Sequence, residues 1–142
     1  MQIMVKIILV AAVLILAVSI YRFYIQNFKS QKDGRALWDD YKVITKEVEG
    51  KELKLVVADT PARFQQGLMF VRKPVDFDGM IFYFKTPQPQ VFWNRNTFED
   101  LDVYWFKNDK IIGKSVLPSV EKSGLKTIAS PGFVDVVIEV IR

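Results

Sequence analysis

Hydrophobic positions divide the sequence into two regions. Residues 3–21 are predominantly apolar and carry one charge, that of Lys6. A run of this length can cross the hydrocarbon core of a bilayer, and a lysine stem is long enough to bring its charge to the membrane surface. We therefore predict a transmembrane anchor at residues 1–25, followed by a polar linker at residues 26–37. A cleaved signal peptide is the alternative, because residues 17–19 (Ala-Val-Ser) have the small side chains of a cleavage site.

From residue 38 onward, short apolar runs alternate with turn signals. Runs rich in β-branched and aromatic residues predict strands, and they lie at residues 43–48, 53–58, 80–84, 101–106, 111–116 and 133–141. The run at residues 80–84 is apolar throughout, which predicts a central strand buried on both faces. The last run alternates, and its predicted buried face consists of Val134, Val136, Ile138 and Val140.

Turn and cap residues indicate how these strands connect. Gly50 and the KNDK segment at residues 107–110 predict two hairpins. One short helix is predicted at residues 60–67, because Thr60 is a good N-cap and Gly67 is a typical helix end. We therefore predict a mostly β domain of the α+β class at residues 38–142. Its sheet is expected to be small, twisted, barrel-like and mainly antiparallel, with one short helix.

The net charge of +4 belongs to the membrane flank. The first 35 residues carry five basic residues and one acid, whereas the remaining 15 basic and 15 acidic residues cancel. The neutral domain does not predict a nucleic-acid partner, and the basic flank is suited to the surface of an anionic membrane. Composition leaves the orientation open: the basic flank favours a cytoplasmic domain, while a short tail before an apolar run favours export.

The chain contains neither histidine nor cysteine. This removes the commonest general base, the commonest zinc ligands and the thiol nucleophile, and the isolated glycines do not form a phosphate-binding loop. We predict no metal, no cofactor and no nucleotide chemistry, and we favour a domain that is not an enzyme. Carboxylate chemistry stays open as an alternative, in which two of Asp78, Glu99, Asp100 and Asp102 act as acid and base.

The segment FWNRNTFEDLD at residues 92–102 gathers most of the candidate binding residues. A tryptophan beside amides and a hydroxyl suits stacking on a polar ring whose edge is hydrogen-bonded. Asp102 begins an apolar strand, where a carboxylate needs a partner such as Arg72 or Arg95. The predicted ligand site consists of Arg72, Trp93, Asn94, Asn96, Thr97 and Asp102. The alternative is that the tryptophan is core and the asparagines satisfy loop backbone.

Four ordered blocks of sequence resemble the DUF192 (UPF0127) family of uncharacterised proteins. They are VADTPARFQQGLMFVRK, DGMIFYF, FWNRNTFEDLDVYWF and PGFVDVVIEV, and the resemblance covers residues 53–140. The family's motif positions fall on Gly67, Leu68, Met69, Arg72, Gly79, Met80, Phe82, Trp93, Asn96, Thr97, Leu101 and Asp102. Asn94 and Arg95 depart from the methionine and lysine that are usual in the family. The resemblance implies a small β-rich fold, commonly exported or tethered to a membrane, and implies no reaction.

Together these features favour a membrane-tethered, extracytoplasmic domain that binds a small polar or saccharide-like ligand. One alternative is a protein–protein interaction module that pairs through a sheet edge, since the chain stops soon after its last strand. A second alternative is a carboxylate-dependent enzyme that acts on cell-envelope polymers.

Overall fold

The computed structural model describes Trp38 and residues 40–142. The predicted anchor at residues 1–25 and the linker at residues 26–37 lie outside the described residues, so both stay predictions. Within the described part of the chain, no helix has the length and apolar character needed to cross a membrane.

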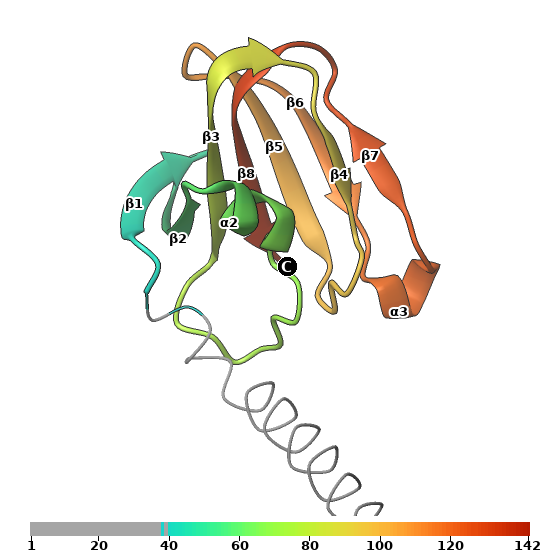
Figure 1. Cartoon of the computed structure of the whole chain (residues 1–142). Helices are drawn as coiled ribbons and strands as arrows, with labels where there is room; N and C mark the ends of the chain where they lie inside the picture. The colour runs from blue at the N-terminus through green and yellow to red at the C-terminus, as the bar shows by residue number, and fades with distance from the viewer. Residues whose placement is uncertain (1–37, 39) are drawn as a thin grey trace, which may run out of the picture. The chain divides into compact units, whose positions relative to one another are not determined.

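The described residues form eight strands and two short helices (Figure 1). In chain order these are β1 (Val43–Val48), β2 (Lys51–Ala58), α2 (Pro61–Gln66), β3 (Gly79–Gln88), β4 (Val91–Trp93), β5 (Leu101–Lys107), β6 (Lys110–Leu117), α3 (Val120–Ser123), β7 (Thr127–Ala129) and β8 (Val134–Ile141). The prediction of a mostly β domain is confirmed. The short elements β4, β7 and α3 were not predicted, because runs of three or four residues carry too little periodicity to be recognised.

Six strands form one sheet in the order β1-β2-β3-β8-β5-β6, and β4 pairs with β7 in a separate two-stranded sheet. β2 and β3 are parallel, because the chain between them crosses over through α2, and the other neighbouring strands are antiparallel. The large sheet is therefore mixed. β3 lies near its middle, as the apolar run at residues 80–84 predicted.

Both predicted hairpins are present, and each has a two-residue turn with positive φ at both positions. The turn residues are Glu49 and Gly50 in the first hairpin, and Asn108 and Asp109 in the second. Such turns match the right-handed twist of the strands that they connect. The predicted helix is also confirmed: the Arg63 amide donates to the Thr60 hydroxyl at 3.2 Å, and the helix ends at Gly67.

The large sheet does not close into a barrel, so the barrel-like prediction was wrong in this respect. Within residues 40–142, β1 and β6 are edge strands of the sheet order. No strand pairs the first hairpin directly with the β5–β6 hairpin among these residues, and they contact each other through side chains. The Tyr104 hydroxyl donates to the Glu49 carboxylate at 3.0 Å, and Lys114 Nζ lies 3.4 Å from that carboxylate. Turn spacing indicated the strands but not their division between two sheets.

Hydrophobic side chains pack on both faces of the large sheet. One face carries Phe82, Trp105 and Val137 and is covered by α2, the loop that follows it, and the β4–β7 ribbon. The opposite face carries Ile81, Tyr104 and Ile138. β8 contributes to both clusters, because its neighbours β3 and β5 place it in the interior of the sheet.

The predicted apolar face of β8 is confirmed at three of its four positions. Val136, Ile138 and Val140 pack in the second cluster, but Val134 lies in the first. The register between β3 and β8 shifts between the pairs of Tyr83 and Gln88, and this irregularity moves Val134 to the other face.

Candidate functional site

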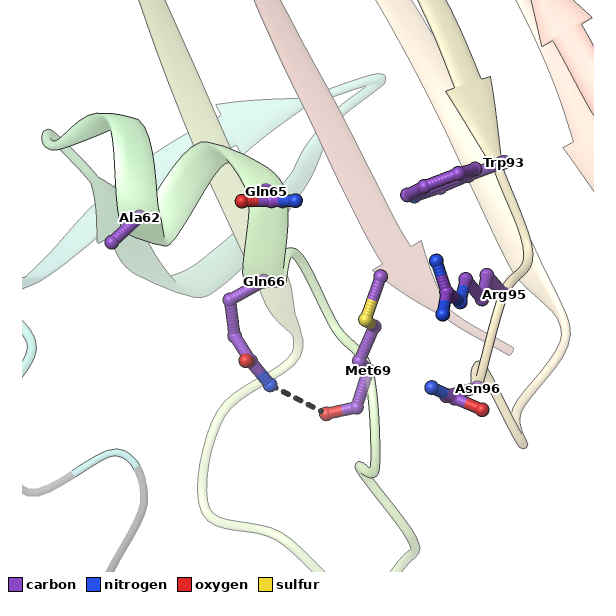
Figure 2. A pocket seen from close by; sticks show the side chains of 7 residues that line it. All are labelled: Ala62, Gln65, Gln66, Met69, Trp93, Arg95 and Asn96. Carbon is purple, nitrogen blue, oxygen red and sulfur yellow. Dashed lines mark hydrogen bonds between the residues drawn. The ribbon is translucent and has the colours of Figure 1, made fainter.

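A cleft of about 300 Å³ lies between α2 with its following turn and the segment that follows β4. Its lining consists of Ala62, Gln65, Gln66, Met69, Trp93, Arg95 and Asn96. Figure 2 shows the glutamines on one side and Trp93, Arg95 and Asn96 on the other, with the Met69 side chain extending into the space between them. This volume is at the lower end of the range found for small-molecule sites.

Two backbone turns hold the walls of this cleft together. Phe70 and Asn96 both have positive φ, which asparagine tolerates but phenylalanine resists. The Phe70 amide donates to the Asn96 carbonyl at 2.8 Å, and this bond joins the turn after α2 to the turn after β4. The Gln66 side-chain amide donates to the Met69 carbonyl at 3.3 Å, which fixes Met69 at the cleft (Figure 2).

The cleft adjoins a narrower inner cavity of about 30 Å³, and the two share Gln65, Gln66, Met69 and Trp93. The remaining residues of the inner cavity are Phe64, Gly67, Leu68, Phe82, Phe92, Thr97 and Glu139. A cavity of this size has room for about one water-sized group. The site therefore has an open polar mouth and a small, mainly aromatic interior.

Glu139 is the one acidic residue among those lining either part of the site, and its side chain is almost completely buried. Glu139 is 3% exposed to solvent. Burial disfavours its charged form and raises its pKa from the ordinary 4.5 to about 8. No hydrogen bond or ion pair from the described residues reaches the carboxyl to oppose this shift. Glu139 is therefore mainly protonated and uncharged at neutral pH.

The position of Glu139 follows from the sheet. On β8 it lies directly opposite Met80 of β3 and Val103 of β5, both of which belong to the cluster beneath α2. Gly67, at the end of α2, lies next to the carboxyl: a Cβ at this glycine would lie 3.8 Å from Glu139 Oε2. The absence of a side chain at Gly67 thus leaves open the space into which the carboxyl points.

The structure brings three of the six predicted site residues to this cleft. Trp93 and Asn96 line the outer part, Thr97 lines the inner cavity, and Trp93 reaches both. The Trp93 ring is 40% exposed, so a ligand can reach it. Arg95, which was not among the six predicted site residues, also lines the mouth, with its guanidinium carbon 5.5 Å from the Trp93 ring centre.

Asn94 is fully buried and lines neither the cleft nor the inner cavity. Its side-chain NH₂ donates to the Pro118 and Gly124 carbonyls at 2.8 and 2.9 Å, and its carbonyl accepts from the Lys126 amide at 2.7 Å. These bonds tie the end of β4 to the segment around α3 and β7. Asn94 therefore satisfies loop backbone, which was the alternative reading of this residue.

Arg72 is also away from the cleft. It is exposed, its guanidinium lies 2.7 Å from the Glu121 carboxylate, and it stacks over the Phe98 ring at 3.9 Å. These contacts connect the loop after α2 to α3, and Arg72 lines neither part of the site.

Asp102 lies on the opposite face of the sheet from Glu139. Its directly opposed neighbour on β8 is Val140, in the second hydrophobic cluster. Its carboxylate is 3.4 Å from Arg142 Nε and 3.7 Å from Lys114 Nζ, rather than beside Arg72 or Arg95. Asp78 is likewise occupied, since its carboxylate accepts from the Lys54 amide at 2.8 Å.

Two other features bear on the choice of site. Among the described residues, no group of three or more histidine, cysteine, aspartate or glutamate residues is arranged to hold a metal. A second hollow of about 460 Å³ lies on the other side of α2, lined in part by Pro61, Tyr83 and Lys85. It has no buried ionisable group, so the cleft above Glu139 is the better candidate.

The sequence matches the DUF192 family, described as an uncharacterised conserved region, over residues 43–142. The chain belongs to the DUF192 family. No curated protein matches it.

Two solved structures resemble the DUF192 domain. A protein from Sinorhizobium meliloti 1021, described as a proposed transcription regulator, is 28% identical, with a TM-score of 0.55; the match covers 71% of this chain and 81% of that one. A protein of unknown function from Novosphingobium aromaticivorans DSM 12444 is 24% identical, with a TM-score of 0.52, and the match covers 72% and 82%. The second likeness shows the fold alone.

Sequence reasoning missed Glu139 as a site residue. The alternation of β8 placed Asp135 and Glu139 on the supposed solvent face, but α2 and its following turn cover the site of Glu139. One signal was present: Glu139 lies within the fourth block that resembles the family, in a run whose neighbours are all apolar. An acid between apolar neighbours marks either an exposed face or a buried functional group.

Proposed function

We propose that this DUF192 domain binds a small polar ligand, of saccharide-like size and polarity, in the cleft above Glu139, and that it is not an enzyme. The observation that carries the proposal is the pairing of an exposed tryptophan ring at the mouth with a buried carboxyl at the floor, which has no partner among the described residues. Small-molecule sites typically combine such an apolar platform with a few polar groups that fix orientation.

The groups of the cleft have distinct proposed roles. The Trp93 ring is a stacking surface for the face of a ligand ring. Gln65, Gln66 and Asn96 offer amide donors and acceptors along the ligand edge, and Arg95 adds a cation. Asn94, Arg72 and Asp102 are not part of this proposed site, because their side chains are engaged elsewhere.

Ligand-detected NMR tests the proposal with monosaccharides, polyols and amino acids offered to the domain. Saturation should transfer from the protein to at least one of these compounds, and Trp93→Ala should abolish the transfer. Phe133→Ala is the matched control, since Phe133 is an exposed aromatic outside the cleft and its loss should change nothing. Equal transfer to the protein and to Trp93→Ala, or none to any compound, would refute the site.

A tethered, extracytoplasmic location is the second part of the proposal. It is supported by the apolar run at residues 3–21 and by the family's frequent export. In cells that express the full chain, the protein should remain in membranes after an alkaline wash, and protease added outside the inner membrane should digest the domain. A protected domain, or one released by the wash, contradicts this location.

The interaction module remains a second candidate, because the open sheet leaves β1 and β6 as edges and β6 exposes Ile111, Ile112 and Val116. Lys110 and Lys114 on the same strand weaken it, since lysines discourage edge pairing. If β6 pairs with a second copy, its amide exchange should slow as protein concentration rises.

The carboxylate enzyme is supported less, because Asp78 and Asp102 both hold structural contacts.

A further inference from the structure

The Glu139 carboxyl is a buried polar group that no hydrogen bond or ion pair from the described residues reaches. Its side chain is 3% exposed, and the remaining access is to the inner cavity, whose lining includes it. Buried carboxyls in folded proteins are normally hydrogen-bonded or paired with a cation. Among the described residues nothing supplies that partner, and the carboxyl lines a cavity in which one could be placed.

The groups around Glu139 favour a cation over a neutral partner. Three phenylalanine rings that contact one another line the cavity. The Phe64 and Phe82 rings stack with their centres 6.3 Å apart, and the Phe82 and Phe92 rings meet edge to face at 5.0 Å. Aromatic faces attract cations, and an ionised carboxylate attracts them more strongly. The Thr97 hydroxyl, which also lines the cavity, can accept a hydrogen bond.

The size of the cavity limits what the cation can be. Its volume of about 30 Å³ has room for about one water-sized group. A primary ammonium is of this size and has three donors, enough for both carboxyl oxygens and the Thr97 hydroxyl. A quaternary ammonium is larger by several methyl groups and does not fit.

The outer cleft limits the remainder of the ligand. Among the described residues that line the outer cleft and the inner cavity, Arg95 and Glu139 are the two charged side chains. The inner cavity's lining residues from α2, its following turn, β3 and β4 include no titratable side chain. Arg95 would repel a second cation. The part of the ligand that lies beside Trp93, Gln65 and Asn96 should therefore be neutral or anionic, as in an amino sugar or an amino acid.

We propose that the inner cavity of this domain recognises a primary ammonium group, which pairs with the Glu139 carboxylate while the rest of a small polar ligand occupies the outer cleft. This rests on the proposed binding function and names the chemistry of its ligand. Because the free carboxyl holds a proton at neutral pH, the ammonium must displace that proton, and binding should strengthen as pH rises through neutrality.

Methylammonium is the simplest probe of the cavity, and the Glu139 carboxyl carbon reports on it directly. The carboxyl of the carbon-13-labelled full chain is titrated by NMR from about pH 5 to about pH 10, a range over which methylammonium, like a lysine ammonium, stays largely charged. Titrations are compared in methylammonium chloride and in sodium chloride at equal concentration. We expect methylammonium to lower the apparent pKa of Glu139 by about one unit or more.

Tetramethylammonium chloride is the size control and should leave the titration as it is in sodium chloride. The inference is overturned if methylammonium has no effect, or if tetramethylammonium lowers the pKa equally, since the cation would then act from the surface. Methylammonium should also shift the Trp93 indole signal of the unaltered protein, because Trp93 lines the inner cavity. Glu139→Gln keeps the side-chain shape, and in this variant the shift should be absent. Neutral saccharides that bind at Trp93 while methylammonium has no effect would refute this inference and leave the proposed function standing.

Discussion

Glu139 shows how one residue is set apart by its surroundings rather than by its type. The chain has other carboxyls whose pKa values move the opposite way: the Tyr104 hydroxyl lowers that of Glu49, and the Lys122 ammonium lowers that of Asp100. Each of these accepts hydrogen bonds at the surface. Glu139 has only burial, which disfavours its charged form and raises its pKa.

This shift has a consequence for stability that depends on pH. Between pH 4.5 and about 8 the unfolded chain releases the Glu139 proton while the folded domain retains it. The free energy of unfolding should therefore fall as pH rises through this window and level off above it. The shifts at Glu49 and Asp100 act at lower pH, because their pKa values are depressed.

Glu139→Gln removes this titration and should make the domain more stable at pH 8 than the unaltered protein. At about 1.4 kcal/mol for each pKa unit, the gain is expected to be a few kcal/mol, and it should shrink toward pH 5. Urea denaturation at both pH values measures it. A variant whose stability follows that of the unaltered protein at every pH would show that Glu139 is ionised and solvated in the fold.

At the scale of elements, the cleft depends on short segments that are too small to be stable alone. α2 has six residues, β4 three and α3 four. Side chains hold them in place: Phe64 of α2 stacks over Phe82 of β3, and Phe92 of β4 packs edge to face on Trp105 of β5 at 5.6 Å. The large sheet thus serves as the platform on which the cleft is built.

Asn94 is the polar connection among three of these segments, and its removal should loosen them. Asn94→Ala leaves the Pro118 and Gly124 carbonyls and the Lys126 amide without their partner. Such buried losses cost roughly 1–3 kcal/mol per group, so we expect the free energy of unfolding to fall by about 3 kcal/mol. Urea denaturation checks this value.

Two further variants separate the hydrogen bonds of Asn94 from its packing. Asn94→Asp keeps the shape and the acceptor for Lys126 but directs a carboxylate oxygen at two carbonyls, so it should be at least as destabilising as alanine. Gln65→Ala is the exposed control and should change stability by less than about 0.5 kcal/mol. If Asn94→Ala also falls within this limit, the network does not stabilise the fold.

At the scale of the whole molecule, the predictions agree with the structure where neighbouring residues determine a helix end or a turn. Thr60 and Gly67 bound the predicted helix, and Gly50 forms the turn of the first hairpin. The predictions fail where the packing of one element against another determines which face of a strand is buried. Alternation showed that Val136, Ile138 and Val140 share a face, but no local pattern showed that a helix covers the opposite face.

The same limit applies to the candidate site. Trp93, Asn96 and Thr97 meet in the cleft because the β4 turn is continuous in sequence, whereas Asp102, on the strand that follows, turns its side chain to the far face. Glu139 of β8 and Trp93 of β4 belong to different sheets, and they meet because the β4–β7 ribbon packs over the large sheet. That kind of proximity depends on how the two sheets pack, which turn and strand signals did not predict.

The three tryptophans allow the central claim, that the cleft above Glu139 is a ligand site, to be tested in one spectrum. Trp93 faces the cleft, whereas Trp38 and Trp105 are buried in the core. When a compound found by the NMR screen is titrated into the labelled domain, the Trp93 indole signal should move and saturate while the other two stay in place. The account is contradicted if the Trp93 signal stays fixed while the compound binds, or if all three signals move together.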